Sequence, residues 1–311
     1  MAVSFRLRVA AATLGAWMAW AAPTHADALP VVEVAPGVFV HAGRHAETDA
    51  GNEGDIANCG FIVGRDAVAV IDSGGGPAIG RRLRDAVRAR TDRPIRYLIN
   101  THMHPDHVLG NAAFVPDEPR VVAHRALQPA LMARSSHYLR MFEDAAGADA
   151  AREVAFLPPS VAVADRLEID LGQRVLELVA HPPAHTDNDL TVFDRQTGTL
   201  WTGDLVFMER APAVDGSALG WLAVLDTLAA APAQRVVPGH GPVSAPWPTA
   251  AVDLRRYLEQ VVAGVRAVQK AGGTIQRAVA EVAVEERPRW KLFDEYHPRN
   301  VTAVFAELEW E

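Results

Sequence analysis

The segment INTHMHPDHVLG, residues 99–110, constrains the fold more than any other part of the chain. Within six positions after an apolar run it carries three imidazoles and one carboxylate, those of His102, His104, Asp106 and His107. Polar groups buried this close together cost on the order of several kcal/mol if any of them stays unpaired. The chain is therefore expected to fold so that these side chains converge on a ligand, and a metal ion suits them best.

Pro105 sets the expected local structure of this segment. Proline suits the first turn of a helix, lacks a backbone donor and pushes the preceding residue toward an extended conformation. An extended run with a period of two points His102 and His104 to the same side, whereas Asp106 and His107 fall in the first helical turn. Nitrogen and oxygen donors without a thiolate favour zinc, with iron or manganese as alternatives.

Short apolar strands alternate with helix-like segments along the chain, which is typical of an α/β fold. We expect a helix from Pro77 to about Arg90, a helical tail from about Ala250, and an amphipathic stretch at 126–146 that could cover a site as a lid. Two strand–turn–strand segments look alike, GFIVGRDAVAVIDSG and DLTVFDRQTGTLWTGD, which favours two related halves sharing a sheet-on-sheet core. Chance similarity between short hairpins is the alternative.

Three further donors follow apolar runs and stand beside glycine, proline or threonine at expected turns. They are His185 in PPAHTDNDL, Asp204 in LWTGDLVF and His240 in VVPGHGP. His181 competes with His185 for the same role, but the pairing of His185 with a following threonine favours His185. We therefore expect His185, Asp204 and His240 to complete the site.

The remaining histidines of interest divide into two groups. His41 and His124 lie in segments that read as strand or loop, and we expect no ligand role for either. His45, in the loop HAGRHAETDAGNEGD, could line the pocket, and the sequence does not decide between that role and an ordinary loop position. Cys59 is the one cysteine, so no internal disulfide can form, and its neighbours predict a buried strand residue.

Taken together, THMHPDH, His185, TGD and PGHG resemble the metallo-β-lactamase superfamily of metallohydrolases, in the family's order and over nearly all of the chain after the leader. The resemblance implies an α/β fold, an αββα sandwich of two mixed sheets flanked by helices, with the site at the sheet edges. It also implies two zinc ions, one held by His102, His104 and His185 and the other by Asp106, His107 and His240, with Asp204 between them. Asp72, in AVIDSG, matches a family aspartate that supports the ligands from behind.

Two divalent cations about 3.5 to 4 Å apart can share a bridging hydroxide and polarise a scissile carbonyl. The resemblance therefore implies a binuclear zinc hydrolase that cleaves an ester, thioester, lactone or amide bond. Asp106 is the expected catalytic residue, as acceptor of the released proton, with Asp204 as the alternative. Three other hypotheses stay open: β-lactamase activity, iron-dependent sulfur redox chemistry, and a non-catalytic metal-binding accessory role. No G-x-S-x-G, G-x-G-x-x-G or P-loop pattern competes.

Asp204 favours thioesterase-like or lactonase-like relatives, because true β-lactamases of this superfamily generally carry cysteine or serine there. The motifs resemble glyoxalase II, although a glutathione-binding tail is not evident. The segments GDIANCGFIVG, LDTLAAAPA and HPRNVTAVFAELE are most similar to the exported quinoprotein relay system zinc metallohydrolases, a SoxH-like subgroup. That name implies a periplasmic quinoprotein dehydrogenase or cytochrome as a candidate partner.

The N-terminus predicts a signal peptide over residues 1–28 and one hydrolase domain over 29–311. Arg6 and Arg8 precede an apolar run of about 14 residues and then small residues, with cleavage after Ala26 or Ala28. We expect a periplasmic or secreted protein with no membrane association after cleavage; an uncleaved anchor is the alternative. The net charge of -8 argues against nucleic-acid binding and leaves a small molecule as the expected substrate.

Overall fold

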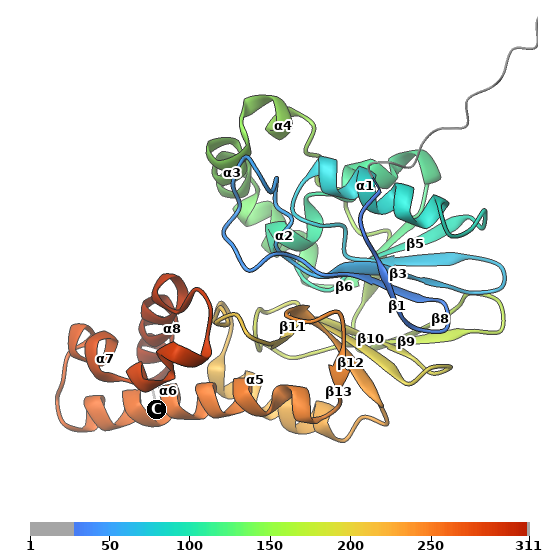
Figure 1. The fold of residues 1–311 in the computed structure, drawn as a ribbon. Coiled ribbons are helices and arrows are strands. Elements are labelled where there is room, and N and C mark those ends of the chain that lie inside the picture. The colour runs from blue at the N-terminus through green and yellow to red at the C-terminus, as the bar shows by residue number, and fades with distance from the viewer. Residues whose placement is uncertain (1–27, 310–311) are drawn as a thin grey trace, which may run out of the picture.

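The computed structural model describes residues 28–309, so the expected signal peptide falls outside the described residues except for its last position. In the described part, two β-sheets pack face to face, and helices cover the outer face of each sheet (Figure 1). This is the α/β sandwich that the sequence predicted. None of the helices in residues 28–309 is long and apolar enough to cross a bilayer.

The first sheet contains seven strands in the order of the chain, antiparallel from β1 to β4 and parallel from β4 to β7. The strands are β1 (Val32–Ala35), β2 (Val38–His41), β3 (Cys59–Val63), β4 (Val68–Ile71), β5 (Ile95–Asn100), β6 (Arg120–His124) and β7 (Val161–Val163).

The second sheet has six strands in the order β13-β12-β11-β10-β9-β8, all antiparallel except the pair β11 and β12. They are β8 (Arg166–Asp170), β9 (Val175–Ala180), β10 (Leu190–Asp194), β11 (Thr199–Phe207), β12 (Arg235–His240) and β13 (Ala245–Pro246). The two similar sequence segments form the hairpins β3–β4 and β10–β11, one in each sheet. Their descent from related halves stays a prediction.

Strand β4 shows how alternate residues of a strand face the two sides of a sheet. Its four residues are all buried, but Ala69 and Ile71 face the core between the sheets, whereas Val68 and Val70 face the opposite side. Each fully buried valine or isoleucine contributes roughly 1.5 to 3 kcal/mol. On that outer side packs α1 (Pro77–Arg88), which ends two residues before the predicted limit.

The remaining helices cover both faces and one end of the sandwich (Figure 1). Over the first sheet lie α2 (Pro105–Val108), the 3₁₀ helix η1 (Asn111–Asp117), α3 (Leu127–Ala146) and α4 (Ala148–Arg152). The predicted helical tail consists of η2 (Thr249–Ala251), α6 (Val252–Lys270), α7 (Ile275–Glu281), η3 (Val284–Arg289) and α8 (Phe293–Leu308), and it packs with α5 (Ala218–Ala229) beside the second sheet. Cys59 is buried in β3, as predicted.

Candidate metal centre

The THMHPDH motif lies where β5 gives way to α2. The strand ends at Asn100, so His102 and His104 lie on a bend and the predicted alternation along a strand is wrong. They still face the same point, because Nε2 of His102 lies 3.2 Å from Nδ1 of His104. His104 has extended backbone angles, φ −64° and ψ 148°, and α2 begins at Pro105, as its proline predicted.

Asp204 reaches the site by a different route from the one expected. It lies inside β11, not at a turn after it, and the pairing with β12 shifts register on both sides of Gly203. Gly203 has φ +49°, and a Cβ there would come within 2.5 Å of Oγ1 of Thr101. This glycine bulge bends the strand toward the motif and aims Asp204 at it. His240 is the last residue of β12, and His185 lies in the β9–β10 loop.

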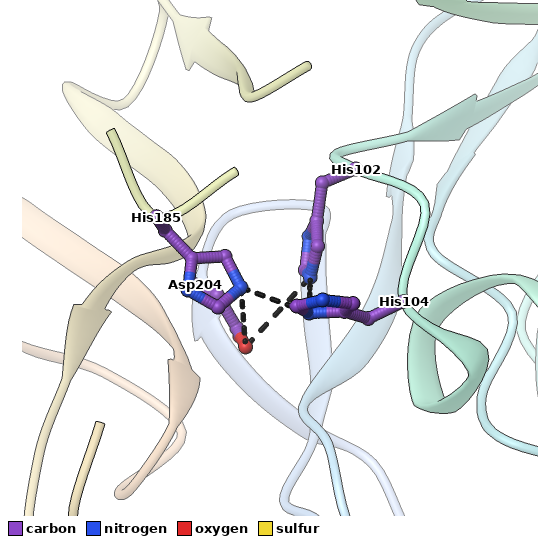
Figure 2. A group of neighbouring side chains, drawn as sticks. All are labelled: His102, His104, His185 and Asp204. Carbon is purple, nitrogen blue, oxygen red and sulfur yellow. Dashed lines mark hydrogen bonds and ion pairs between the residues drawn. The ribbon is translucent and has the colours of Figure 1, made fainter. Parts of the chain in front are cut away.

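Four side chains from both sheets form the first cluster, defined as His102, His104, His185 and Asp204 (Figure 2). Nδ1 of His104 lies 3.2 Å from Nε2 of His102 and 3.0 Å from Nε2 of His185. Oδ2 of Asp204 lies 3.4 Å from Nε2 of His185 and 3.7 Å from Nε2 of His102. A tetrahedral zinc site with bonds of about 2.05 Å has donor–donor edges of about 3.3 Å. These side chains therefore fit one zinc ion.

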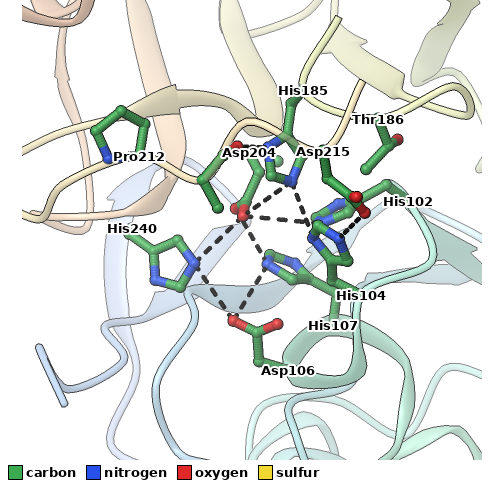
Figure 3. Close-up of polar contacts among 12 residues, drawn as sticks. His102, His104, Asp106, His107, His185, Thr186, Asp204, Pro212, Asp215 and His240 are labelled. Carbon is green, nitrogen blue, oxygen red and sulfur yellow. Dashed lines mark hydrogen bonds and ion pairs between the residues drawn. The ribbon is translucent and has the colours of Figure 1, made fainter. Parts of the chain in front are cut away.

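The second cluster consists of Asp106, His107 and His240 and adjoins Asp204 (Figure 3). Oδ2 of Asp106 is 3.3 Å from Nε2 of His240, and Oδ1 of Asp204 is 3.1 Å from Nε2 of His107. Among the described residues, Nε2 of His107 and Oδ1 of Asp204 are buried without a hydrogen-bond partner. A bound cation would satisfy both atoms. All seven donors that the sequence singled out thus meet in two groups joined by Asp204.

Each imidazole of the two clusters has one ring nitrogen that faces away from the centre, and this outer nitrogen contacts a hydrogen-bond acceptor. Nδ1 of His107 donates to Oδ2 of Asp72 at 2.8 Å, and Asp72 also accepts the N–H and hydroxyl of Thr101 at 2.8 and 2.7 Å. Asp72 thus lies behind the cluster, where the family resemblance placed it. The other four contacts are His102 Nδ1 to Thr101 Oγ1, His104 Nε2 to Asp215, His185 Nδ1 to the carbonyl of Ala213, and His240 Nδ1 to the carbonyl of Ile56. Such contacts orient imidazoles toward a metal.

The electrostatics differ between the clusters. Burial lowers the pKa of His185 to about 3 and lowers that of His102 well below its ordinary value, so both are neutral donors. Burial opposes protonation of His107 as well, but Asp204, Asp72 and Asp106 raise its pKa. Burial likewise opposes ionisation of Asp204, yet its histidine neighbours, His240 first, lower its pKa. The first cluster thus already has the neutral imidazoles that a divalent cation requires, whereas His107 would have to release its proton when a cation binds.

A cavity of about 670 Å³ opens over both clusters and reaches the helices around them. Helix α3 forms one wall of this cavity through Ala133, Arg134, Tyr138, Met141, Phe142 and Ala145. Its role as a lid stays a prediction. Opposite lie Arg210 and Tyr296, the latter from α8. Asp106, His104 and Asp204 border the cavity, so a molecule inside it would reach both groups of donors.

The sequence did not predict two residues that make contacts around the site, Asp215 and Arg210. Asp215 accepts from Nε2 of His104 at 3.0 Å and also from Arg134 of α3, so it links His104 to the cavity wall. Burial raises the pKa of Asp215, but the bonds from His104 and Arg134 outweigh it and lower the pKa to about 2. Arg210 is 2% exposed and donates to the hydroxyl of Tyr296. Nothing in the loop sequence around Asp215 or Arg210 marks either residue.

The other histidines that the sequence analysis considered lie apart from the two clusters. Nε2 of His181 bonds Oγ1 of Thr191 at 2.9 Å, and the structure therefore brings His185, not His181, to the centre. His41 contacts Asp55 at 2.6 Å, and Nδ1 of His124 accepts from a backbone N–H, as expected for strand or loop residues. His45 contacts Glu209 at 3.3 Å and is not among the residues that border the cavity.

The fold and the donors define a class: an αββα protein with a histidine- and aspartate-rich centre between the edges of its two sheets. The sequence profile of the Metallo-beta-lactamase superfamily matches residues 52–240, which is more than half of the chain. The chain belongs to this superfamily. Members of it are generally hydrolases and typically bind metal ions, and the site described above agrees with both properties.

Several known proteins are similar in sequence or structure. A linear primary-alkylsulfatase of Pseudomonas sp. is 25% identical over 59% of this chain, and the alpha subunit of a 2,4-dinitroanisole O-demethylase of Nocardioides sp. is 26% identical over 47%. These matches span only 41% and 40% of the two relatives. Among solved structures, the sec-alkylsulfatase Pisa1 from Pseudomonas sp. has a TM-score of 0.70 at 17% identity, covering 90% of this chain and 50% of its own.

A metallo-beta-lactamase from Pontibacter korlensis has a TM-score of 0.60 at 20% identity, covering 74% of this chain and 99% of its own. Identities this low show that the fold is shared, and they give no information about the substrate. These similarities do not show that the chain belongs to the subgroup of exported quinoprotein relay hydrolases.

Proposed function

We propose that the protein is a binuclear zinc hydrolase that cleaves an ester, thioester, lactone or amide bond of a small molecule. One observation carries the proposal: seven donors form two groups, each with its ligand atoms within 4.8 Å, at the edge of a cavity large enough for a small molecule. Two bound divalent cations supply an activated water at neutral pH and polarise the bond to be broken. The chain's own residues must then hold the substrate and move the proton.

Asp106 is the chain's candidate for the proton transfer. Its carboxylate borders the cavity, and its side chain is 12% exposed, so a bound substrate can reach it. Burial opposes its ionisation, but His107 and His240 lower its pKa, so the carboxylate is ionised. Asp204 is more enclosed, with a side chain 4% exposed, which favours a structural role in joining the two clusters.

The test combines metal content with a substrate panel. The purified protein should contain about two zinc ions per chain, and a chelator should abolish hydrolysis of at least one lactone, thioester, β-lactam or phosphodiester. Asp106→Ala should lose that activity, whereas Asp165→Asn, in an exposed turn beside β8, should keep it. Full activity without metal would rule the proposal out. Tightly held iron with oxygen consumption would favour the redox alternative.

A sulfate ester is a second candidate substrate, favoured by the two walls of the cavity. Arg210 is buried, its Nε has no hydrogen-bond partner among the described residues, and its ion-pair partner Glu47 is 3.6 Å away. Buried charges normally have close partners, so a bound anion would improve this site. The apolar side chains of α3 opposite suit an alkyl chain. Two relatives named above are alkylsulfatases.

Release of sulfate from an alkyl sulfate would establish this second candidate. Arg210→Met should raise the KM for the sulfate ester about 10-fold or more, since a hydrogen bond to a charged group is worth about 1.5 to 3 kcal/mol. The KM for an uncharged ester should change far less. Equal effects on both substrates would argue against anion recognition by Arg210.

The proposal extends to where the protein works. We propose a signal peptide over residues 1–28, export to the periplasm or medium, and one hydrolase domain over 29–311, in the manner of the quinoprotein relay, SoxH-like subgroup. The N-terminal residue of the exported protein, read by sequencing, tests the cleavage. Capture of a periplasmic quinoprotein dehydrogenase or cytochrome by the exported protein tests the partner. If His104→Ala kept the full cellular phenotype, the non-catalytic accessory role would be favoured.

A further inference from the structure

Segment 212–215, between β11 and α5, holds the outer nitrogens of two histidines of the first cluster (Figure 3). Nδ1 of His185 donates to the carbonyl of Ala213 at 2.7 Å, and Nε2 of His104 donates to Asp215 at 3.0 Å. Because these bonds occupy one nitrogen of each ring, the other nitrogen faces the centre. The position of this short segment therefore sets the orientation of two of the three imidazoles.

Segment 212–215 has no regular secondary structure, and one buried side chain of α8 secures it. Asn300 is 1% exposed. Its Oδ1 accepts from the N–H of Val214 at 2.9 Å, and its Nδ2 donates to the carbonyl of Pro212 at 2.7 Å. These two bonds bracket Ala213, whose carbonyl accepts from His185. Buried groups left unpaired by removal of such an amide cost about 1 to 3 kcal/mol, so the segment would shift to recover them.

A different buried asparagine secures the second cluster. Asn58 is 3% exposed and lies just before β3. Its Nδ2 donates to the carbonyl of Pro238 at 2.9 Å, and its N–H donates to the carbonyl of Gly239 at 2.7 Å. These bonds hold the end of β12, where His240 lies. Two residues earlier, the carbonyl of Ile56 accepts from Nδ1 of His240 at 2.8 Å.

We propose that each metal site has its own positioning asparagine: Asn300 for the first cluster and Asn58 for the second. This inference rests on the proposed binuclear function and adds to it that helix α8, beyond the segment matched by the family profile, is part of the machinery of the first site. Neither asparagine touches a metal donor directly. Asn300 acts through the backbone that accepts from His185, and Asn58 acts through the strand end that carries His240.

Zinc affinity tests the assignment of one asparagine to each metal site, and the measurement needs no substrate. Competition between the metal-free protein and a chromophoric chelator gives two zinc dissociation constants, which His185→Ala and His240→Ala assign to the first and second clusters. Loss of an outer partner typically weakens metal binding about 10- to 100-fold. Asn300→Ala should weaken the first constant by about that factor and leave the second within about twofold, because Asn300 acts on the acceptors behind the first cluster. Asn58→Ala should show the reverse.

A matched control separates positioning from loss of stability. Nε2 of Gln269 donates to the carbonyl of Phe305 at 2.8 Å, which joins α6 to α8 away from segment 212–215. Gln269→Ala should lower the free energy of unfolding and change neither zinc constant. Asn300→Asp keeps an acceptor for Val214 and loses the donor to Pro212, so it should also weaken only the first site; it carries the test if Asn300→Ala does not fold.

Two results would overturn the inference: equal weakening of both zinc constants by Asn300→Ala, or an unchanged first constant in both Asn300 variants. A wild-type protein that binds fewer than two zinc ions would instead overturn the proposed binuclear function. The two failures are therefore distinguishable in the same titration.

Discussion

The two clusters of candidate metal donors adjoin at Asp204 but differ in how the protein holds them. The second cluster lies at the ends of regular elements: His107 in α2, His240 closing β12, and Asp72 just after β4 as the acceptor behind His107. The first cluster depends on a bend after β5, the β9–β10 loop and segment 212–215. Regular backbone fixes side-chain direction by itself, whereas loops need tertiary partners to do so.

The clusters differ equally in charge. The first has two histidines whose pKa burial lowers, to about 3 for His185. The second pairs Asp106 with His107, whose pKa is raised because three carboxylates overcome the effect of burial. Without metal, His102 and His185 of the first cluster therefore stay neutral, whereas His107 of the second retains a proton. The comparison teaches that one centre can combine neutral imidazoles held by loops with a protonated imidazole surrounded by carboxylates.

The largest effect is expected from a change at Asp204. Because Asp204 serves both clusters, its loss should affect both of them. Asp204→Ala removes the oxygen that lies 3.4 Å from both His185 and His240. We expect loss of both zinc ions and a fall in hydrolysis of about 10³-fold or more, on the order of 4 kcal/mol. Elemental analysis and turnover measure these changes. Retention of one zinc ion with near-normal turnover would contradict the shared role.

A second prediction concerns pH on the side of the first cluster. Burial lowers the pKa of His181, in the β9–β10 loop that also carries His185, to about 4 from an ordinary 6.5. Between these values the unfolded chain binds a proton and the folded chain does not, so stability is full above pH 6.5 and falls as the pH drops toward 4. The loss should be about 3 kcal/mol at most.

Denaturant unfolding of the metal-free protein between pH 7 and 4 measures this slope. His181→Gln should make it shallower, because glutamine does not titrate and can still bond the hydroxyl of Thr191. Part of the slope should remain, since burial also lowers the pKa of His102 and His185. An identical slope in wild type and variant would exclude His181 as the source.

The third prediction sharpens the comparison at Asp72. Its carboxylate contacts His107 directly and reaches His102 only through Thr101. Asp72→Asn should therefore weaken zinc at the second cluster by about 10- to 100-fold and at the first cluster much less. The same chelator competition resolves the two constants. Equal losses would show that Asp72 supports the whole centre and not one half.

The smallest effect is expected at the link from α3. Arg134 pairs with Asp215, but their side chains are 41% and 31% exposed, and such pairs contribute about 0 to 1 kcal/mol. Arg134→Ala should change zinc affinity at the first cluster by at most about fivefold. Salt should reduce the difference between wild type and variant, since exposed ion pairs are screened. A change beyond about tenfold would mean that α3 controls the first cluster directly.

Much of the site was predictable because its chemistry is local in the sequence. Pro105 marked the start of α2, and crowded donors marked the motif around it. The alternating apolar runs predicted an α/β protein, and the family resemblance implied two mixed sheets; the structure and the family match confirm both. The assignment of the seven donors as metal ligands stays a prediction, although the structure brings all of them together.

Other features could not be predicted, because their cause lies far away in the chain. The bulge at Gly203 lies where Thr101, just after β5 of the other sheet, approaches the backbone, and Asp204 therefore stands inside a strand and not after one. Asp215 faces His104 across 111 positions, and Asn300 bonds Pro212 across 88. The residues next to an aspartate in a loop or an asparagine in a helix do not indicate which distant group it will bond.

The sequence alone determined which donors this protein has and the period of the elements that carry them, because backbone sterics and side-chain chemistry act within a few residues. The tertiary structure decided which way each imidazole faces and which helix supports it. Those choices depend on hydrogen bonds between segments that only the packing of the two sheets and the C-terminal helices brings within reach.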